Sequence, residues 1–374
     1  LSKQIVMRYK LLGRTGVEVS ELCMGTMAFG GDADKKESAK MFKLCRDAGI
    51  NIFDCANVYE KGRSETILGE LIADSRDELI ITSKVYFPMS EDINARGGSR
   101  KHIMAALNNS LKRLNTDFID IYFLHRFDDY TPLEETLRAL EDLVASGKIL
   151  YLGASNYAAW QVAKGLGISN KNGWNRFEWI QPMYNLVKRQ AEVEILPMAM
   201  SEKISVFSYS PLGGGLLTGK YAGGKRPKTS RFMKNKMYAE RYRDPSLFQT
   251  AEALQKLAES EGLSPISLAL AWVKSHPAIT APIIGGRNAK QLKPSLDSVK
   301  IEMTEELRSR ISELSPEPPP ATDRNEEKTE LKSEEKVVET SKAENNQPKV
   351  SKDKEKKDEP KKKVLKEKSP EKKK

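Results

Sequence analysis

The stretch NIFDCANVYEKGRSE, residues 51–65, joins a short apolar run to an aspartate and a tyrosine. The run INIFD (50–54) predicts a buried strand that ends on the carboxylate of Asp54. Tyr59 follows five residues later, just before SETILGELIAD (64–74), whose spacing predicts an amphipathic helix. This strand–helix unit, with polar residues where the strand ends, is the pattern from which both fold and site can be inferred.

The same unit recurs along the chain. Seven further apolar runs precede helix-like stretches, namely SELCMG (20–25), ELIITSK (78–84), FIDIYFLH (118–125), ILYLGASN (149–156), FEWIQPMYN (177–185), ISVFSYSPLG (204–213) and ITAPIIGG (279–286). Continuous apolar runs suit parallel strands that are covered on both faces. Eight such units within about 300 residues favour a closed (β/α)8 TIM barrel. A doubly wound sheet is the alternative, but the glycine-rich phosphate loops typical of that fold are absent.

The remaining elements follow from weaker patterns. The segment MRYKLLGRTGVEVSEL (7–22) alternates weakly around a turn near Arg14–Gly16, which predicts an N-terminal β-hairpin that plugs the barrel floor. Amphipathic spacing places the helices at 35–49, 64–74, 99–115, 133–148, 191–203, 247–262, 264–276 and 288–299, with a short helix near Trp160.

Composition divides the chain into two parts. From Pro316 onward there is no Phe, Trp or Tyr, and residues 321–374 hold 18 Lys or Arg and 14 Asp or Glu. Such a segment cannot bury enough apolar surface to offset its ordering entropy. We therefore expect a barrel over residues 1–315 and a disordered, charged, Lys/Glu-rich C-terminal tail over residues 316–374. The net charge of +10 comprises +4 from residues 321–374 and +6 from the rest.

The end of the tail, EPKKKVLKEKSPEKKK (359–374), is basic enough to attract nucleic acid, an anionic membrane or an acidic protein partner. It has no aromatic residues for base stacking and no amphipathic pattern for a membrane surface. An acidic partner is one interpretation, and a tail that only solvates the protein is the one that the composition favours.

Several classes of protein are disfavoured. Three cysteines, Cys23, Cys45 and Cys55, give no paired framework, which favours a reducing compartment, and we expect the cytoplasm. No apolar run reaches the length of a membrane span, and LSKQIVMRYK (1–10) lacks the apolar core of a signal peptide. The three histidines lie far apart and no Cys-x-x-Cys occurs, so no metal site is expected.

Polar residues, or glycines that expose the backbone, recur where the predicted strands end, at Gly25, Asp54, Lys84, His125, Asn156, Gln181, Ser208 to Ser210 and Gly285. The C-terminal strand ends of a (β/α)8 barrel meet at one mouth, so we expect Asp54, Tyr59, Lys84 and His125 to lie together. Taken singly, each has an ordinary explanation, as a turn cap, a packing tyrosine, a solvated charge and a structural histidine. Their joint occurrence at successive strand ends favours a site.

These four residues suggest carbonyl chemistry. A lysine beside Tyr59 is expected to lower the pKa of the phenol, because an adjacent cation favours phenolate. Asp54 would hold Lys84 in place and charged, and His125 would orient a carbonyl oxygen that receives the proton of Tyr59. Reduction also needs a hydride donor, which no side chain supplies, so a cofactor is expected.

The motifs FDCANVYEKGRSE, ITSK, IDIYFLHRFD, YLGASNY, QPMYN, YSPLGGGLLTGKY and IIGGRNAKQL occur in the order and spacing of the aldo-keto reductases, which this chain resembles over roughly residues 7–300. YSPLGGGLLTGKY and NLVKRQ are most similar to the branch that includes the potassium-channel β subunits and their bacterial relatives. The resemblance implies an NADPH-dependent oxidoreductase that reduces an aldehyde or ketone to an alcohol. Its catalytic residues would be Asp54, Lys84, His125 and the general acid and base Tyr59.

The resemblance also implies how NADPH binds across the barrel mouth. Ser155, Asn156 and Gln181 would hold the nicotinamide carboxamide, and Tyr209 would stack on the ring. The other residues expected near the cofactor are Gly25, Thr26, Met27, Ser210, Leu212, Gly214, Lys220, Arg231 and Gly285.

At the adenosine end, Arg287 with Gln291 would meet the 2′-phosphate, for which a guanidinium is well suited. Arg287 therefore favours NADPH over NADH. The sequence departs from the family after Gln291, where related chains often carry Glu and Asn for the adenine and this chain has Pro294 and Ser295. Weaker adenine recognition is expected.

A second function remains open, that of a regulatory module that binds NADPH and turns over slowly, as the channel subunits do. His125 favours the enzyme, because those subunits carry Asn at the matching position, whereas the tail favours a partner. The substrate is a small carbonyl compound whose identity does not follow, and neither does the oligomeric state. The loops expected to shape its pocket are 27–34, with Met27 and Phe29, 126–131 and 221–246.

Overall fold

A computed structural model describes residues 6–221, 225, 227 and 230–322. Residues 1–321 form one compact unit, and residues 322–374 are assigned to a second. Residues 323–374, most of the predicted tail, lie outside the described residues, so the predicted disorder stays a prediction.

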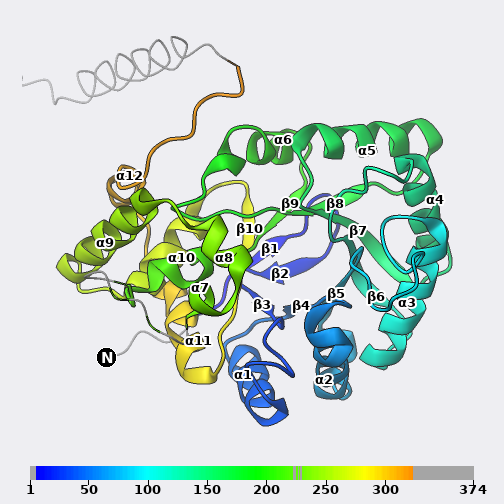
Figure 1. Ribbon diagram of the computed structural model, residues 1–374, viewed down its shortest axis with the longest axis horizontal. Coiled ribbons are helices and arrows are strands. Elements are labelled where there is room, and N and C mark those ends of the chain that lie inside the picture. The colour runs from blue at the N-terminus through cyan, green and yellow to red at the C-terminus, as the bar shows by residue number, and fades with distance from the viewer. Residues whose placement is uncertain (1–5, 222–224, 226, 228–229, 323–374) are drawn as a thin grey trace, which may run out of the picture. The chain divides into compact units, whose positions relative to one another are not determined.

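Eight parallel strands close into a barrel in the order β10-β3-β4-β5-β6-β7-β8-β9 (Figure 1). The strands are β3 (Cys23–Gly25), β4 (Ile52–Asp54), β5 (Ile80–Val85), β6 (Ile119–Leu124), β7 (Ile149–Ser155), β8 (Phe177–Gln181), β9 (Ser205–Ser208) and β10 (Ile279–Ile284). Each predicted apolar run contains one of them. The predicted barrel is thereby confirmed, and the doubly wound alternative is wrong.

Helices surround the barrel (Figure 1). They are α1 (Lys35–Asp47), α2 (Arg63–Ile72), α3 (Arg100–Leu114), α4 (Leu133–Ala145), α5 (Ala159–Asn172), α6 (Ile195–Ser201), α7 (Arg231–Lys234), α8 (Lys236–Arg241), α9 (Pro245–Ser260), α10 (Pro265–Ser275), α11 (Ala289–Leu296) and α12 (Glu305–Ser312). Within the described residues, no helix is both long and apolar enough to cross a membrane.

The helix near Trp160 differs from the prediction of a short helix, since α5 has 14 residues. Glycines in this stretch argue against a long helix, because glycine weakens a helix interior. Gly165, however, faces the ring of Phe177 on β8, and a Cβ atom at this position would lie 2.7 Å from that ring. The glycine therefore permits close helix–sheet packing and does not end the helix.

The N-terminal hairpin closes one end of the barrel. β1 (Tyr9–Leu11) and β2 (Glu18–Ser20) pair antiparallel, as predicted. Leu12 and Val19 are fully buried in the cluster of side chains that fills the barrel interior. The backbone N–H of Ser20 donates to the Asn51 side chain at 2.8 Å, directly before β4, which places the hairpin at the N-terminal strand ends. The hairpin does not cover the opposite end of the barrel, at the C-terminal ends of the strands, where a ligand can bind.

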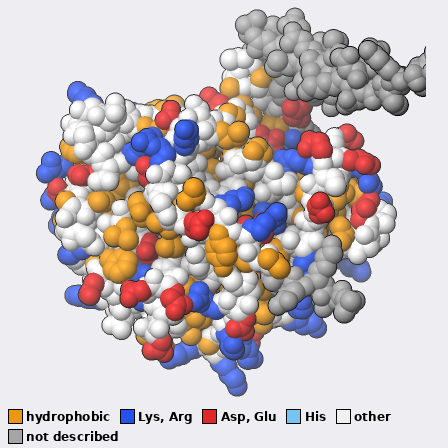
Figure 2. All heavy atoms as spheres, turned by 180° about the vertical axis from the view of Figure 1, so that it is seen from behind, with side chains coloured by type: hydrophobic (Ala, Val, Ile, Leu, Met, Phe, Trp, Pro, Cys, Tyr) orange, Lys and Arg blue, Asp and Glu red, His pale blue; other side chains and the backbone are white. Residues whose placement is uncertain are grey.

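The surface carries charges of both signs, interspersed with hydrophobic side chains on the face shown in Figure 2. Many form exposed ion pairs along one helix, such as Lys43 with Asp47 at 2.9 Å. Exposed pairs of this kind contribute only about 0.2–1 kcal/mol each. The stability of the barrel therefore depends mainly on its core.

Candidate active site

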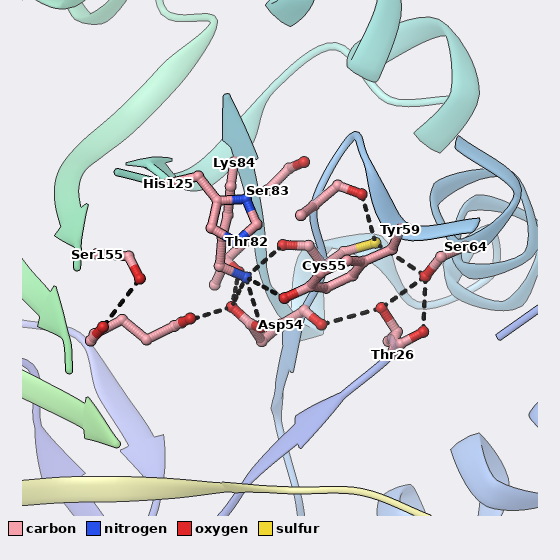
Figure 3. A network of polar contacts seen from close by, with 12 residues as sticks. Thr26, Asp54, Cys55, Tyr59, Ser64, Thr82, Ser83, Lys84, His125 and Ser155 are labelled. Carbon is pink, nitrogen blue, oxygen red and sulfur yellow. Dashed lines mark hydrogen bonds and ion pairs between the residues drawn. The ribbon is translucent and has the colours of Figure 1, made fainter. Parts of the chain in front are cut away.

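The four predicted catalytic residues lie together at the C-terminal ends of neighbouring strands (Figure 3). Asp54 is the last residue of β4, Lys84 lies near the end of β5, and His125 directly follows β6. Tyr59 begins the short 3-10 helix η1 (Tyr59–Gly62), in the loop after β4. Parallel strands bring their carboxyl ends to one edge, which is why residues so far apart in sequence converge here.

Asp54 and Lys84 form a buried ion pair. The Lys84 Nζ lies 2.7 Å from both carboxylate oxygens of Asp54. The Asp54 side chain is 3% exposed and the Lys84 side chain is 0% exposed. Thr82 Oγ1 and Gln181 Nε2 also donate to Asp54 Oδ1, at 2.8 and 2.9 Å. A buried pair is tolerated only when its remaining hydrogen bonds are satisfied, and these donors meet that requirement.

The same ammonium also reaches Tyr59. Lys84 Nζ donates to the Cys55 carbonyl at 2.8 Å and to the Tyr59 hydroxyl at 3.3 Å. Burial lowers the pKa of Lys84, but the charge and hydrogen bonds of Asp54 outweigh it and hold that pKa above its usual value. The lysine is therefore a cation aimed at the phenol oxygen.

The pKa of Tyr59 corrects the prediction made from its lysine neighbour. Burial raises this pKa to about 12, and the opposing effect of Lys84 does not cancel it. The sequence shows the charge beside the phenol but not its removal from water, which disfavours phenolate. Tyr59 is thus a neutral phenol at physiological pH, and its proton is available for donation.

His125 completes the cluster as a neutral imidazole. Burial, with the Lys84 charge as a second cause, lowers the pKa of His125 to about 3. Its ring meets the ring of Tyr59 edge-on at 6.0 Å and that of Phe87 at 5.0 Å between centroids. Its Nδ1 atom has no hydrogen-bond partner among the described residues. That nitrogen is itself buried. A neutral imidazole still carries one N–H, which can donate a hydrogen bond to a carbonyl oxygen.

The turn after Tyr59 is strained. Glu60 and Lys61 both have left-handed backbones, with φ of 48° and 56°. Each such residue costs roughly 1–2 kcal/mol when it is not glycine. Strained backbone of this kind persists where the surrounding structure holds it, and it clusters at functional sites. Here it directly follows Tyr59, whose ring centroid lies 5.0 Å from Lys84 Nζ.

The residues predicted for the nicotinamide connect directly to this cluster. Gln181, besides bonding Asp54, accepts a hydrogen bond at its carbonyl from Ser155 Oγ at 2.9 Å. Asn156 donates to the His125 carbonyl at 2.9 Å and accepts from the Tyr209 hydroxyl at 2.7 Å. The structure therefore brings these four side chains next to the predicted catalytic residues, and their role toward a cofactor stays a prediction.

A groove of about 360 Å³ leads away from Tyr59. Its lining comprises Met27, Ala28, Asp32, Val58, Tyr59, Glu60, Asn235, Tyr238 and Arg287. Two residues predicted for the cofactor, Met27 and Arg287, thus share a groove with the predicted general acid. Gly214 supports its wall, because a Cβ atom there would lie 2.8 Å from the Tyr238 ring. A groove with a phenol and a guanidinium fits part of an anionic dinucleotide.

Other predicted cofactor residues lie outside the groove lining. Thr26 is buried and bonds the Asp54 carbonyl through its hydroxyl at 3.0 Å. Gly25 approaches β10 closely, since a Cβ atom there would lie 2.7 Å from Ile283. Ser210, Leu212, Lys220, Gly285 and Gln291 also stand outside that lining. The side chain of Arg231 lies outside the described residues.

Sequence reasoning missed two residues of the site. Thr82 bonds Asp54, and it precedes Lys84 by two positions on β5, so the alternation of a strand puts both on one face. Phe87 packs on His125 from the loop after β5, for which the sequence carries no comparable signal. Among the described residues, no group of three or more His, Cys, Asp or Glu side chains is arranged to hold a metal ion.

Comparison with known proteins identifies the family. The family model described as Aldo/keto reductase family matches residues 21–316. A Bacillus subtilis (strain 168) protein named uncharacterized oxidoreductase YrpG is 37% identical over 328 residues, which cover 83% of this chain and 97% of that protein. A probable voltage-gated potassium channel subunit beta from Oryza sativa subsp. japonica is 36% identical over 302 residues, 79% of this chain and 92% of that protein. The versiconal hemiacetal acetate reductase of Aspergillus parasiticus is 30% identical over 326 residues, 80% of this chain and 94% of that protein. The chain therefore belongs to the aldo/keto reductase family and is an NAD(P)H-dependent oxidoreductase.

Proposed function

We propose that this protein uses NADPH to reduce an aldehyde or ketone to the alcohol, with Tyr59 as general acid and base. The observation that carries the proposal is the hydrogen bond of 3.3 Å from the Lys84 ammonium to the Tyr59 hydroxyl, in a site where Lys84 is held by Asp54. A hydrogen bond from a buried cation stabilises the phenolate that remains after Tyr59 gives up its proton.

The proton follows a short path. A carbonyl oxygen beside Tyr59 Oη takes the phenol proton, and the negative charge left on Tyr59 faces the Lys84 ammonium. His125 is neutral, so it orients the carbonyl by hydrogen bonding and does not compete as an acid. The reduced nicotinamide, when bound, supplies the hydride. In the reverse direction the Tyr59 phenolate takes the proton of an alcohol.

The choice of NADPH rests on the groove. Asn156, Gln181 and Tyr209 lie around the catalytic cluster and would hold the nicotinamide end. Arg287 lies in the groove that contains Tyr59, and a guanidinium is suited to a 2′-phosphate. We propose that adenine binding is weak, because Pro294 lies inside α11 and Ser295 is fully buried.

A second candidate is a regulatory subunit that binds NADPH and turns over slowly. It is supported by similarity to proteins named as potassium channel β subunits from Oryza sativa and Arabidopsis thaliana, at 36% and 35% identity. The imidazole of His125, edge-on to Tyr59, favours the enzyme, because it supplies a group that can orient a carbonyl.

The test is a titration of the purified chain with NADPH and NADH by intrinsic fluorescence, followed by para-nitrobenzaldehyde while nicotinamide absorbance is recorded. We expect NADPH binding with turnover, and a Tyr59→Phe variant that binds NADPH with the same Kd but does not reduce the aldehyde. Binding without turnover in the unaltered protein would favour the regulatory subunit. Failure to bind either nucleotide would contradict both candidates.

A further inference from the structure

Arg287, the guanidinium predicted to receive a 2′-phosphate, is already paired with a carboxylate of the same chain. Arg287 Nε lies 3.0 Å from Asp32 Oδ2, and the two side chains are 27% and 46% exposed. Asp32 belongs to the loop between β3 and α1, whereas Arg287 lies between β10 and α11. The ion pair therefore joins the two loops at the edge of the groove that contains Tyr59.

A second carboxylate covers the start of α11. The backbone N–H of Ala289, the first residue of this helix, donates to Glu37 Oε1 at 2.8 Å. Glu37 is in the first turn of α1, which packs beside α11 (Figure 1). Lys40 contacts the other oxygen of Glu37 at 3.1 Å. Backbone N–H groups at a helix start are where an anion such as a phosphate binds best, so Glu37 takes a position that an anionic ligand would favour.

The backbone and side-chain groups around Arg287 and the start of α11 also form hydrogen bonds with one another. Arg287 donates its backbone N–H to Gln291 Oε1 at 3.2 Å, and the Gln291 N–H donates to the Asn288 side chain at 2.9 Å. The charged side chains that line the groove are Asp32, Glu60 and Arg287, two carboxylates and one guanidinium. The described lining is thus net negative, although a dinucleotide is itself an anion.

We infer that Asp32 and Glu37 are specificity-determining residues, which weaken the preference for NADPH over NADH that Arg287 alone would give. The inference rests on the proposed function, since it requires a nicotinamide dinucleotide in the groove. A 2′-phosphate carries a charge near −2. One that binds at Arg287 lies near the Asp32 carboxylate, which pairs with this guanidinium, and near the start of α11, where Glu37 accepts the Ala289 N–H. The uncharged 2′-hydroxyl of NADH meets no such repulsion, and it can donate a hydrogen bond to a carboxylate.

The test compares Asp32→Asn, Glu37→Gln and the double variant with the unaltered full-length protein. Both substitutions remove a charge and retain an oxygen that accepts the bond from Arg287 or Ala289. Asp47→Asn is the matched control, because Asp47 is an exposed carboxylate at the other end of α1, paired with Lys43. Kd values are measured for NADPH, NADH, adenosine 2′,5′-bisphosphate and ADP at fixed ionic strength.

Each single variant is expected to bind NADPH and adenosine 2′,5′-bisphosphate about three- to tenfold more tightly, while the Kd for NADH and ADP changes less than about twofold. Asp47→Asn should leave all four values unchanged. When Arg287→Gln is added to Asp32→Asn, most of the gain in affinity for NADPH and adenosine 2′,5′-bisphosphate should be lost. A higher salt concentration should reduce the difference in NADPH affinity between the variants and the unaltered protein, since salt screens charges that are partly exposed to solvent.

Three results would overturn the inference. Weaker NADPH binding by Asp32→Asn would mean that the carboxylate positions Arg287 for the phosphate. Equal tightening toward NADPH and NADH would mean a general charge effect without specificity. Unchanged affinities would mean that the carboxylates do not oppose the ligand. If the unaltered protein binds neither nucleotide, the proposed function fails as well, whereas the three other results leave it standing.

Discussion

The ammonium of Lys84 lies 2.7 Å from both oxygens of Asp54, and neither side chain is more than 3% exposed. Such a pair contributes little net stability, because desolvation opposes the attraction. The Tyr59 hydroxyl lies 3.3 Å from the same ammonium, which is the arrangement on which the proposed catalytic role of Tyr59 rests. The first prediction concerns what happens when one partner is removed.

Lys84→Met is expected to lower the free energy of unfolding by about 3–5 kcal/mol, because it leaves Asp54 as a buried charge without a cation. The double variant Lys84→Met with Asp54→Leu should recover part of this loss. Lys43→Met is the control, since its exposed pair with Asp47 should contribute under about 1 kcal/mol. Urea unfolding measures all three. A loss below about 1 kcal/mol for Lys84→Met would show that the pair is not isolated from water.

Acid should destabilise the protein partly through His125. Its pKa is about 3 in the folded chain and about 6.5 when unfolded, so between these values only the unfolded chain binds the proton. The stabilisation is complete above about pH 6.5 and is lost as the pH falls toward 3. When the pH is lowered from 7 to 4, the free energy of unfolding of His125→Asn should therefore fall by about 3 kcal/mol less than that of the unaltered protein.

Denaturant unfolding at the two pH values gives this difference. The pKa of His276 is also lowered, to about 4, chiefly by burial. That histidine is present in both proteins, so its contribution cancels. An identical loss of stability in both proteins would mean that the imidazole of His125 titrates normally.

The strained turn after Tyr59 predicts a stabilising substitution. Lys61→Gly should raise the free energy of unfolding by about 1 kcal/mol, because glycine adopts a φ of 56° without a Cβ clash. Lys101→Gly is the matched control, since Lys101 is an exposed residue of α3 and should lose about 1 kcal/mol. Thermal unfolding compares the variants. A loss of stability in both would show that the turn is not under strain.

Removal of the charged C-terminal segment should not change the stability of the barrel. A chain that ends at Pro320 is expected to have nearly the same Tm as the full chain, because no Phe, Trp or Tyr follows Pro316 and little apolar area remains to be buried. Scanning calorimetry of both chains measures the difference. A drop of many degrees would mean that these residues pack on the barrel.

Much of the fold and of the site can be predicted from the sequence. Continuous apolar runs such as FIDIYFLH specify parallel strands, because both of their faces must be buried. Eight such runs favour a barrel, and the barrel brings Asp54, Lys84 and His125 to one mouth by geometry alone. The hairpin likewise follows from local alternation around its turn.

Properties that depend on burial and on distant contacts were decided by the tertiary structure. The lysine beside Tyr59 is readable in the sequence, but the burial that raises the Tyr59 pKa to about 12 is not. Gln181 bonds Asp54 from 127 positions away, and Ala289 bonds Glu37 across 252 positions. Local patterns determine where the chain is strand or helix, because periodicity reflects which face is buried. Only packing determines which polar groups lose water and which partner they then meet.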